Sequence, residues 1–358
     1  MRTAKASAPP AGVPDVNHPA VSVVVPVLNE GASIAKCLDH IAGQDFAGSM
    51  EVLLVDGGST DGSRAFLQAR AEADARFRVL DNPKGLVSSA LNLAIAAARG
   101  ETVVRVDAHT LLDPGYLRTC LAVLRETGAE NVGGPLRPVG TTPFGRSVAL
   151  AMGSRFGVGT APFRFAERRR EVDTVYLGAF PRRLFERVGG FDETLLRNQD
   201  YEMNHRIRRA GGRIVVDPAV VCRYLTRPDA PSLWRQYFSY GYWKTQMLRK
   251  HPRSIKLRQL APPAFVSALA GSAVFSGIGL ATGRTGLVLA AALPVGLWLL
   301  AALATTALAA LRHGLGPSLR LPAVFAIIHL AWGLGFWKGW RRPPVRPAGA
   351  APPGTGRL

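Results

Sequence analysis

The chain has 358 residues, of which 47% are hydrophobic and 19% charged, and its formal net charge is +19. This excess of Lys and Arg favours an anionic partner such as nucleic acid, lipid headgroups or a phosphorylated substrate, although an Ala-, Arg-, Gly- and Pro-rich composition is also typical of a high-GC genome. Nucleic acid is disfavoured, because the charge comes without a zinc-ligand spacing, a helix-turn-helix pattern or an RNA-binding aromatic motif.

The N-terminal region and the cysteines indicate where the first domain resides. Residues 1–19 contain no apolar stretch suited to a signal peptide and are expected to form a flexible Pro- and Ala-rich tail. Cys37, Cys120 and Cys222 are odd in number, far apart and without a CxxC pair. That pattern predicts reduced, buried thiols in the cytoplasm, on the side of the membrane where the chain is made.

Alternating strands and helices are predicted in the N-terminal part of the chain. Largely apolar runs at residues 21–28 and 51–55 are typical of strands that are buried on both faces, and another strand is expected at 102–106. A short strand is expected at 76–80, and a helix at 86–99, where Leu and Ala recur on one face. Such an alternation predicts βαβ units and a mainly parallel sheet.

Polar side chains follow three of these strands. Asn29 and Glu30 follow the first strand, Asp56 the second, and Asp107 and His109 the fourth. Because ligands of parallel sheets bind beyond the carboxyl ends of the strands, these side chains predict an active site at that edge. The first strand is not followed by G-x-G-x-x-G, which disfavours a dinucleotide-dependent oxidoreductase.

A membrane region is predicted at residues 251–340. Apolar stretches at 260–281, 287–311 and 321–337 carry no charge in their middle, and each is long enough to cross or enter a bilayer. Buried core helices are the alternative, which three such stretches in a row make less favourable.

Basic residues on both sides of this region leave its topology open. The Lys- and Arg-rich segment 249–258 favours a cytoplasmic start. The tail at 341–358 is expected to be flexible and is basic. Three full spans would place it outside the cytoplasm, whereas basic segments next to membrane spans favour the cytoplasmic side. Two spans with a re-entrant or interfacial third segment are the alternative.

Four segments, in this order, resemble motifs of family 2 glycosyltransferases with a GT-A fold. They are VSVVVPVLNEGASIAKCLDHI, EVLLVDGGSTDGS, VRVDAH and GGFDETLLRNQDYEMNHRIRRAGG. The DAH tripeptide and SRFGVGTAPFR at 154–164 are similar to the transferases of succinoglycan-type exopolysaccharide assembly. The resemblance implies an α/β chain, with a Rossmann-like GT-A catalytic domain over residues 20–250 followed by C-terminal transmembrane helices.

The resemblance also implies a nucleotide-diphosphate sugar donor, and a UDP-sugar is favoured. Asp56 would accept a hydrogen bond from the uracil N3–H, although Gly57 stands where many relatives have a second Asp. Lys84 would approach phosphate. The residues that would line the base and ribose are Pro26, Val27, Asn29 and Glu30, for which a simple cap at the end of the strand is the alternative.

Asp107 and His109 stand where the family commonly has Asp-x-Asp. The resemblance implies that Asp107 contacts the donor and that both residues hold a divalent metal. Side chains one residue apart on an extended segment point to the same side, and a hard cation neutralises the charge of a departing diphosphate. Histidine in place of Asp shifts the preference from Mg²⁺ towards Mn²⁺. An exposed loop histidine is the alternative for His109.

Asp200 matches the catalytic base of the family, and Gln199 stands in the preceding Glu position. The resemblance implies that Asp200 takes the proton of the acceptor hydroxyl and that the transfer inverts the anomeric configuration. An ordinary helix N-terminal Asp is the alternative. Further candidates for contacts with the acceptor or the diphosphate are Arg164, Asp192, Gln199, Trp243 and Lys244, each of which also has a structural interpretation.

Together these patterns predict a membrane-anchored transferase of exopolysaccharide assembly. It would act at the cytoplasmic face of a bacterial inner membrane, on a lipid-linked or polysaccharide acceptor. A processive polysaccharide synthase is the first alternative, disfavoured because residues 232–244 lack the Gln-x-x-Arg-Trp spacing of such enzymes. A non-catalytic membrane scaffold is the second, disfavoured because Asp107 and Asp200 are both present.

Overall fold

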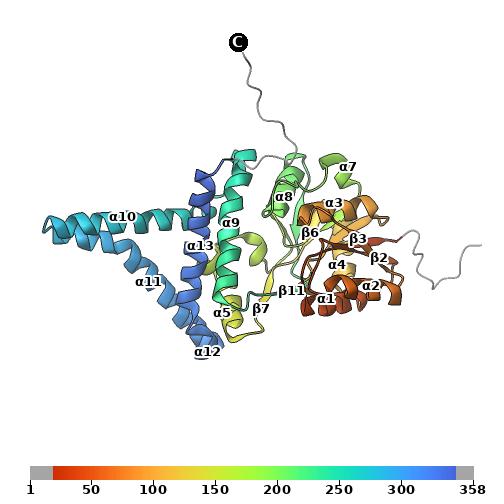
Figure 1. Ribbon diagram of the computed structural model, residues 1–358, viewed down its shortest axis with the longest axis horizontal. Coiled ribbons are helices and arrows are strands. Elements are labelled where there is room, and N and C mark those ends of the chain that lie inside the picture. Colours follow the sequence, from red (N-terminus) through yellow and green to blue (C-terminus); the bar gives the residue numbers. More distant parts are fainter. Residues whose placement is uncertain (1–18, 344–358) are drawn as a thin grey trace, which may run out of the picture.

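The computed structural model describes residues 19–343 (Figure 1). The expected N-terminal tail up to residue 18, and the C-terminal tail from residue 344, lie outside the described residues. The N-terminal half of the chain alternates strands with helices, as predicted. Its first elements are β1 Val21–Val27, α1 Ala32–Ala42, β2 Met50–Asp56, α2 Ser63–Ala73, β3 Phe77–Asp81, α3 Val87–Ala97 and β4 Thr102–Arg105.

The next part of the chain completes this domain with shorter elements. They are β5 Thr110–Leu112, α4 Tyr116–Thr127, β6 Asn131–Gly133, β7 Arg137–Val139, α5 Pro143–Met152, α6 Arg155–Val158, β8 Arg170–Glu171, β9 Ala179–Pro181, α7 Leu184–Val188, α8 Gln199–Arg209, β10 Ile214–Val216 and β11 Cys222–Leu225. A 3₁₀ turn covers Pro162–Arg164.

The main sheet has eight strands in the order β3-β2-β1-β4-β9-β6-β10-β8. β1 lies between β2 and β4 and is parallel to both, while β9 is antiparallel to β4 and to β6. The predicted, mainly parallel sheet is therefore confirmed, with β8 and β9 as antiparallel members. A second sheet has the order β5-β11-β7.

Alternating side chains of β1 enter two separate cores, one on each face of the sheet. Val23 and Val25 pack with Leu38 of α1, whereas Val24 packs with Leu91 of α3 on the other face. A strand that is covered on both faces favours apolar residues at successive positions, and the one polar residue of β1, Ser22, donates its hydroxyl to Glu51 at 2.7 Å. The three cysteines are free and buried, as predicted.

The described chain is helical from residue 230 onwards. Its long helices are α9 Ala230–Lys250, α10 Ala261–Ala281, α11 Thr285–His313 and α13 Leu321–Arg341, with the short α12 Leu315–Ser318 between the last two and 3₁₀ turns at Pro252–Ser254 and Leu257–Gln259. Three apolar helical stretches, Ala261–Ala281, Thr285–His313 and Leu315–Arg341, are long enough to cross a membrane.

The α10–α11 hairpin projects away from the rest of the molecule (Figure 1). Its surface carries exposed Leu, Val and Phe side chains, including Phe275 and Leu297, which are 53% and 64% exposed. α13 differs, because it packs along α9, next to the α/β domain. A Cβ on Gly241 of α9 would lie 1.9 Å from the Trp332 carbonyl oxygen, and one on Gly335 of α13 would lie 2.1 Å from that of Phe238. These glycines let the two helices approach closely.

Candidate active site

The polar residues that follow β1, β2 and β4 lie together at the carboxyl edge of the sheet, because these strands are adjacent and parallel. The turns after β1 and β2 are joined directly. Asn29, which has a φ of 53°, accepts a hydrogen bond from the Thr60 amide at 2.8 Å and donates its own amide to Ser59 Oγ at 3.0 Å. Asn29 therefore fixes the relative position of the two turns.

Asp56 ends β2 and is 1% exposed. Its carboxylate accepts hydrogen bonds from the amides of Gly58 and Ser59, each at 3.2 Å, and from Arg64 Nη1 at the same distance. Gly58 has a φ of 87°, in the left-handed region that favours glycine. The carboxylate is thus held at the bottom of a turn, with its position fixed by backbone amides.

Arg105 links the two carboxylates that the sequence identifies as most important. It is the last residue of β4 and is 5% exposed. Its Nε donates to Asp107 Oδ1 at 2.9 Å, and its Nη1 contacts Asp200 Oδ1. A metal-ligand candidate and a base candidate, far apart in the sequence, are therefore held by one guanidinium.

The two carboxyl groups differ in their electrostatics. Burial favours the neutral form of Asp107, but the charges of Arg105 and His109 outweigh burial, so the pKa of Asp107 lies below its ordinary value. For Asp200 burial dominates over the opposing effect of Arg105, and the pKa is raised. The lowered pKa of Asp107 is typical of a carboxylate that can bind a cation, and the raised pKa of Asp200 is typical of a base that accepts a proton.

His109 lies beside Glu30, with 3.6 Å between Nδ1 and Oε1, and its ring meets the edge of Tyr224. No group of three or more His, Cys, Asp or Glu side chains that could hold a metal occurs between residues 19 and 343. A cation here would take one or two protein ligands and complete its shell with phosphate oxygens and water. Mg²⁺ commonly binds in this way, so Asp107 and His109 fit a metal shared with a nucleotide.

Asp200 is the second residue of α8, and its side chain is 34% exposed. Asn198 caps the helix with a φ of 65°, a left-handed conformation that Asn tolerates. The amides of the first helical turn favour an ionised carboxylate at this position. Gln199, the first residue of the helix, is 4% exposed and points into the domain rather than to solvent.

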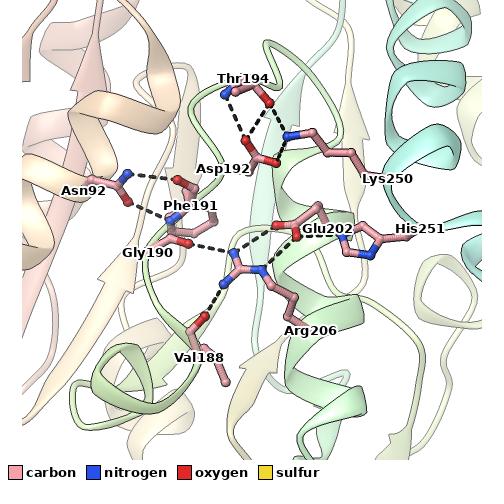
Figure 2. A network of polar contacts seen from close by, with 10 residues as sticks. All are labelled: Asn92, Val188, Gly190, Phe191, Asp192, Thr194, Glu202, Arg206, Lys250 and His251. Atoms are coloured by element: carbon pink, nitrogen blue, oxygen red, sulfur yellow. Dashed lines mark hydrogen bonds and ion pairs between the residues drawn. The ribbon is translucent and has the colours of Figure 1, made fainter. Parts of the chain in front are cut away.

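α8 is held in place by a buried ion-pair cluster (Figure 2). Glu202 is 2% exposed and accepts hydrogen bonds from Arg206 at 2.8 and 2.9 Å, while its Oε1 lies 3.0 Å from Nε2 of His251. Arg206 also donates to the carbonyls of Val188 and Gly190. The helix that carries Asp200 is thereby tied to the preceding loop and to the end of α9.

The same loop is anchored at two further points, both visible in Figure 2. The Asn92 side chain exchanges two hydrogen bonds with the backbone of Phe191, at 2.7 and 2.9 Å. Asp192 accepts from the Thr194 amide at 3.0 Å and from Lys250 Nζ at 2.5 Å. Asp192 therefore organises this loop, and its carboxylate is already paired within the chain.

The remaining candidates fall into three groups. Lys84 is exposed and pairs with Glu193 at 2.7 Å, and Trp243 packs beside Tyr201. Arg164 and Lys244 instead line a cavity of about 530 Å³ between the α/β domain and the C-terminal helices. The side chains of Pro26 and Val27 belong to β1, where Val27 is buried and Pro26 is half-buried.

Arg105 was missed in the sequence. A charged residue at the end of a buried four-residue strand was the available signal, because such a charge needs a partner. The cavity was missed as well, because its lining comes from many separate elements.

Comparison with known proteins gives consistent relatives. The family described as "Glycosyl transferase family 2" matches residues 22–188. The chain is 32% identical over 321 residues to the succinoglycan biosynthesis protein ExoA of Rhizobium meliloti, covering 88% of this chain and 93% of the relative. It is 25% identical over 239 residues to the dolichyl N-acetyl-alpha-D-glucosaminyl phosphate 3-beta-D-2,3-diacetamido-2,3-dideoxy-beta-D-glucuronosyltransferase of Methanococcus voltae, covering 64% of this chain and 74% of the relative.

A solved structure is also similar. The mannosyltransferase PcManGT from Pyrobaculum calidifontis, in complex with GDP-Man and Mn²⁺, aligns with a TM-score of 0.56 and 25% identity. The alignment covers 91% of this chain and 90% of that one, so the likeness includes the C-terminal helices as well as the α/β domain.

Proposed function

Because this chain belongs to glycosyl transferase family 2, we propose that it moves a sugar, with inversion, from a nucleotide-diphosphate donor to a lipid-linked or envelope polysaccharide acceptor. Sugar transfer and the GT-A fold follow from the family; the donor, the acceptor and the stereochemistry are the proposal. The observation that carries it is the arrangement of Asp107, Arg105 and Asp200, which lie at the carboxyl edge of the sheet. Carboxylates suited to a metal and to a base are held side by side there.

The donor is proposed to bind across the turns after β1, β2 and β4. Asp56, fixed by backbone amides, is placed to accept from a nucleobase N–H, and a uracil is the base we favour. Asn29 and Glu30 lie in the turn after β1, where Asn29 binds the Thr60 amide and Glu30 lies beside His109. A divalent metal held by Asp107 and His109 would neutralise the diphosphate, and a similar mannosyltransferase carries Mn²⁺ with GDP-Man.

Asp200 is proposed to act as the general base. Its raised pKa and partial exposure suit a carboxylate that receives the proton of the acceptor hydroxyl as that oxygen attacks the anomeric carbon. The bond to the diphosphate breaks as the new bond forms, and the nucleoside diphosphate leaves with the electron pair. Arg105 holds Asp200 through one oxygen, so the other oxygen remains available for the proton.

The acceptor is proposed to be attached to a membrane lipid or to an envelope polysaccharide. One relative acts in succinoglycan biosynthesis, and the name of the other describes transfer to a dolichyl-phosphate-linked sugar. A processive synthase remains the second candidate, because it would share the donor site. A scaffold without activity is less favoured, since both carboxylates are retained and paired.

Metal removal tests the donor half of this proposal. Purified full-length protein is incubated with a panel of nucleotide sugars and Mn²⁺, Mg²⁺ or EDTA, and release of nucleoside diphosphate is measured. We expect one donor to be turned over, with EDTA abolishing the turnover and Mn²⁺ or Mg²⁺ restoring it. The reason is that a divalent metal neutralises the negative charge of the departing nucleoside diphosphate. Turnover that is unaffected by EDTA would contradict the metal role of Asp107 and His109.

The membrane arrangement is proposed from the contacts of α13. Near its start, Ser147 of α5 donates to the Pro317 carbonyl at 2.6 Å, and at its end Arg249 of α9 donates to the Trp340 carbonyl at 2.5 Å. Both ends of α13 therefore contact elements on the catalytic side of the molecule. We propose that only the α10–α11 hairpin crosses the bilayer and that α13 lies at the surface of an inner membrane, with the catalytic domain in the cytoplasm.

Labelling with a membrane-impermeant maleimide tests this topology in intact cells. Thr282→Cys places a thiol at the exposed hairpin turn, and Arg342→Cys places one after α13. The native thiols of the described chain are buried and give a low background. We expect labelling at position 282 from outside, and at position 342 only after permeabilisation. The reverse result at position 342 would indicate three full spans.

A further inference from the structure

The cavity of about 530 Å³ lies where the catalytic domain meets the membrane helices. Its size is typical of a small-ligand site. Part of its lining comes from the catalytic domain, including Tyr176 and Asn198, and part comes from α9, α10, α11 and α13. No residue of the proposed donor site lines it, so it is a separate space that adjoins the active site.

Two cations that line this cavity have no carboxylate partner among residues 19–343. Lys244 is 2% exposed; its ammonium lies 3.8 Å from the centre of the Tyr201 ring and 3.5 Å from the Met247 sulfur. Within residues 19–343 no carboxylate forms an ion pair with it, and Asp173, which acts on it from further away, is paired with Arg258. Arg164 has a buried Nη1 without a hydrogen-bond partner among the same residues. Arg258, by contrast, is paired with Asp173 at 2.6 Å.

Burial of a charge without a counter-ion is unfavourable, because water no longer solvates it. Accordingly, burial lowers the pKa of Lys244 to about 7. A bound anion would remove this penalty for Lys244, and it would accept charge-assisted hydrogen bonds from Lys244 and from the half-buried Arg164. The positions of Lys244 and Arg164 therefore favour a ligand that carries a negatively charged group.

Another part of the cavity lining is apolar. It consists of Phe265 of α10, Trp298 of α11, and Ile328 and Trp332 of α13. Phe265 and Trp298 stack with their ring centres 5.5 Å apart. These helices include the hairpin that we place in the bilayer, so the apolar wall continues towards lipid. A ligand that contacts both parts of the lining is anionic at one end and hydrocarbon at the other.

The position of the cavity relates it to the transfer step. Asn198 is two residues before Asp200, and Tyr176 hydrogen-bonds Thr110, three residues after Asp107, at 2.8 Å. A group that emerges from the cavity past Asn198 would meet the base. A negatively charged lipid head held by Lys244 would thus present whatever is attached to it to Asp200.

We propose that this cavity binds the acceptor as an isoprenoid-type lipid phosphate, with the phosphate on Lys244 and Arg164 and the first units of the chain along Phe265, Trp298 and Trp332. The inference rests on the proposed function, in which the acceptor is attached to a lipid. Here it assigns a defined subsite and two phosphate ligands to that acceptor. The 530 Å³ volume holds only the head and the start of a long chain, and the rest would lie in the bilayer.

Binding of farnesyl diphosphate to the full-length protein in detergent tests the proposal. EDTA is present to suppress metal-dependent binding of a diphosphate at the donor site, and quenching of tryptophan fluorescence or calorimetry reports binding. We expect farnesyl diphosphate to bind more tightly than both farnesol, which lacks the phosphate, and pyrophosphate, which lacks the chain. Equal affinity for farnesol or for pyrophosphate would overturn the proposal.

Variants identify the site. Lys244→Met keeps most of the length of the side chain and removes its charge, and Arg164→Gln removes the charge of the second cation with a shorter polar side chain. We expect each to weaken binding of farnesyl diphosphate by at least about tenfold, the loss typical of one charge-assisted contact. Lys36→Met, at an exposed lysine of α1, is the matched control and should bind like the wild type. Wild-type affinity in both cavity variants would overturn the assignment.

Melting curves show whether each variant is folded, and Arg164→Gln provides the test if Lys244→Met is not. Donor turnover of the wild-type protein separates this inference from the proposed function. If the donor is turned over but binding of farnesyl diphosphate does not depend on either cation, the cavity assignment fails alone. If lipid binding depends on them but no donor is turned over, the proposed function fails and the subsite stands.

Discussion

Replacement of Asp200 by Asn is expected to reduce sugar transfer by about 10²–10⁴-fold and to leave donor affinity unchanged, because general-base catalysis contributes that much. Asn has nearly the same shape and can still accept a hydrogen bond from Arg105 through its oxygen, but it cannot take the proton of the acceptor hydroxyl. Steady-state transfer and equilibrium binding of the donor to the same preparation check this expectation.

Asp229→Asn is the matched control for this substitution. Asp229 is an exposed N-cap that accepts from the Ser232 amide at 2.7 Å at the start of α9, where Asn caps equally well. The sugar transfer activity of the Asp229→Asn protein should equal that of the wild type. The assignment of Asp200 as base would be wrong if Asp200→Asn retained wild-type transfer, or if it lost donor binding to the same degree as transfer.

Replacement of Asp107 by Asn should lower kcat/KM by about 10²–10³-fold, since a metal supplies several kcal/mol of stabilisation to a departing diphosphate. Unlike Asp200→Asn, this variant should also need far more Mn²⁺ or Mg²⁺ for half-maximal activity. Arg105 keeps its contact with Asp200 in the variant, so the base should remain in place. Activity titrated with each metal at a fixed donor concentration measures the effect.

Asp113→Asn separates this effect from a general loss of charge near the site. Asp113 follows β5 and pairs with Arg223 at 3.2 Å, with a side chain that is 32% exposed. The Asp113→Asn protein should reach half-maximal activity at the same metal concentration as the wild type. An unchanged metal titration in Asp107→Asn would remove that residue from the proposed metal site.

The α/β part of the fold could be predicted from the sequence, because strands that are buried on both faces appear as largely apolar runs. The run Val21–Val27 is β1, and the predicted order of strands and helices up to β4 was confirmed. The antiparallel insertion of β9 between β4 and β6 was not predicted. Its three residues carry no periodic signal, and only the pairing with β4 and β6 defines them as a strand.

The edge of the sheet that carries the site was also predictable, since the carboxyl ends of adjacent parallel strands must meet. The contact of Arg105 with Asp200 was not predictable, because the two residues are 95 positions apart and meet only in the folded domain. The roles proposed for Asp56, Asp107, His109 and Asp200 remain predictions that the variants above test.

Hydropathy alone could not distinguish α13 from the hairpin helices, although the glycines of its segment left a re-entrant or interfacial position open. All three are apolar, and apolar side chains pack equally well against lipid and against protein. Gly335 and Gly339 mark the difference, because a Cβ on either would meet the backbone or a side chain of α9. Two glycines four residues apart in an apolar helix were the available signal for close helix packing.

Transfer of a labelled sugar into the lipid fraction of membranes is the most direct test of the account. Membranes that contain the wild-type chain are incubated with labelled nucleotide sugars and Mn²⁺, and extracted lipid is counted. We expect label from one donor, lost with EDTA and in membranes that contain Asp200→Asn. Label that appears equally with the wild type and with Asp200→Asn, or no label from any donor, would contradict the proposal that this chain glycosylates a membrane lipid.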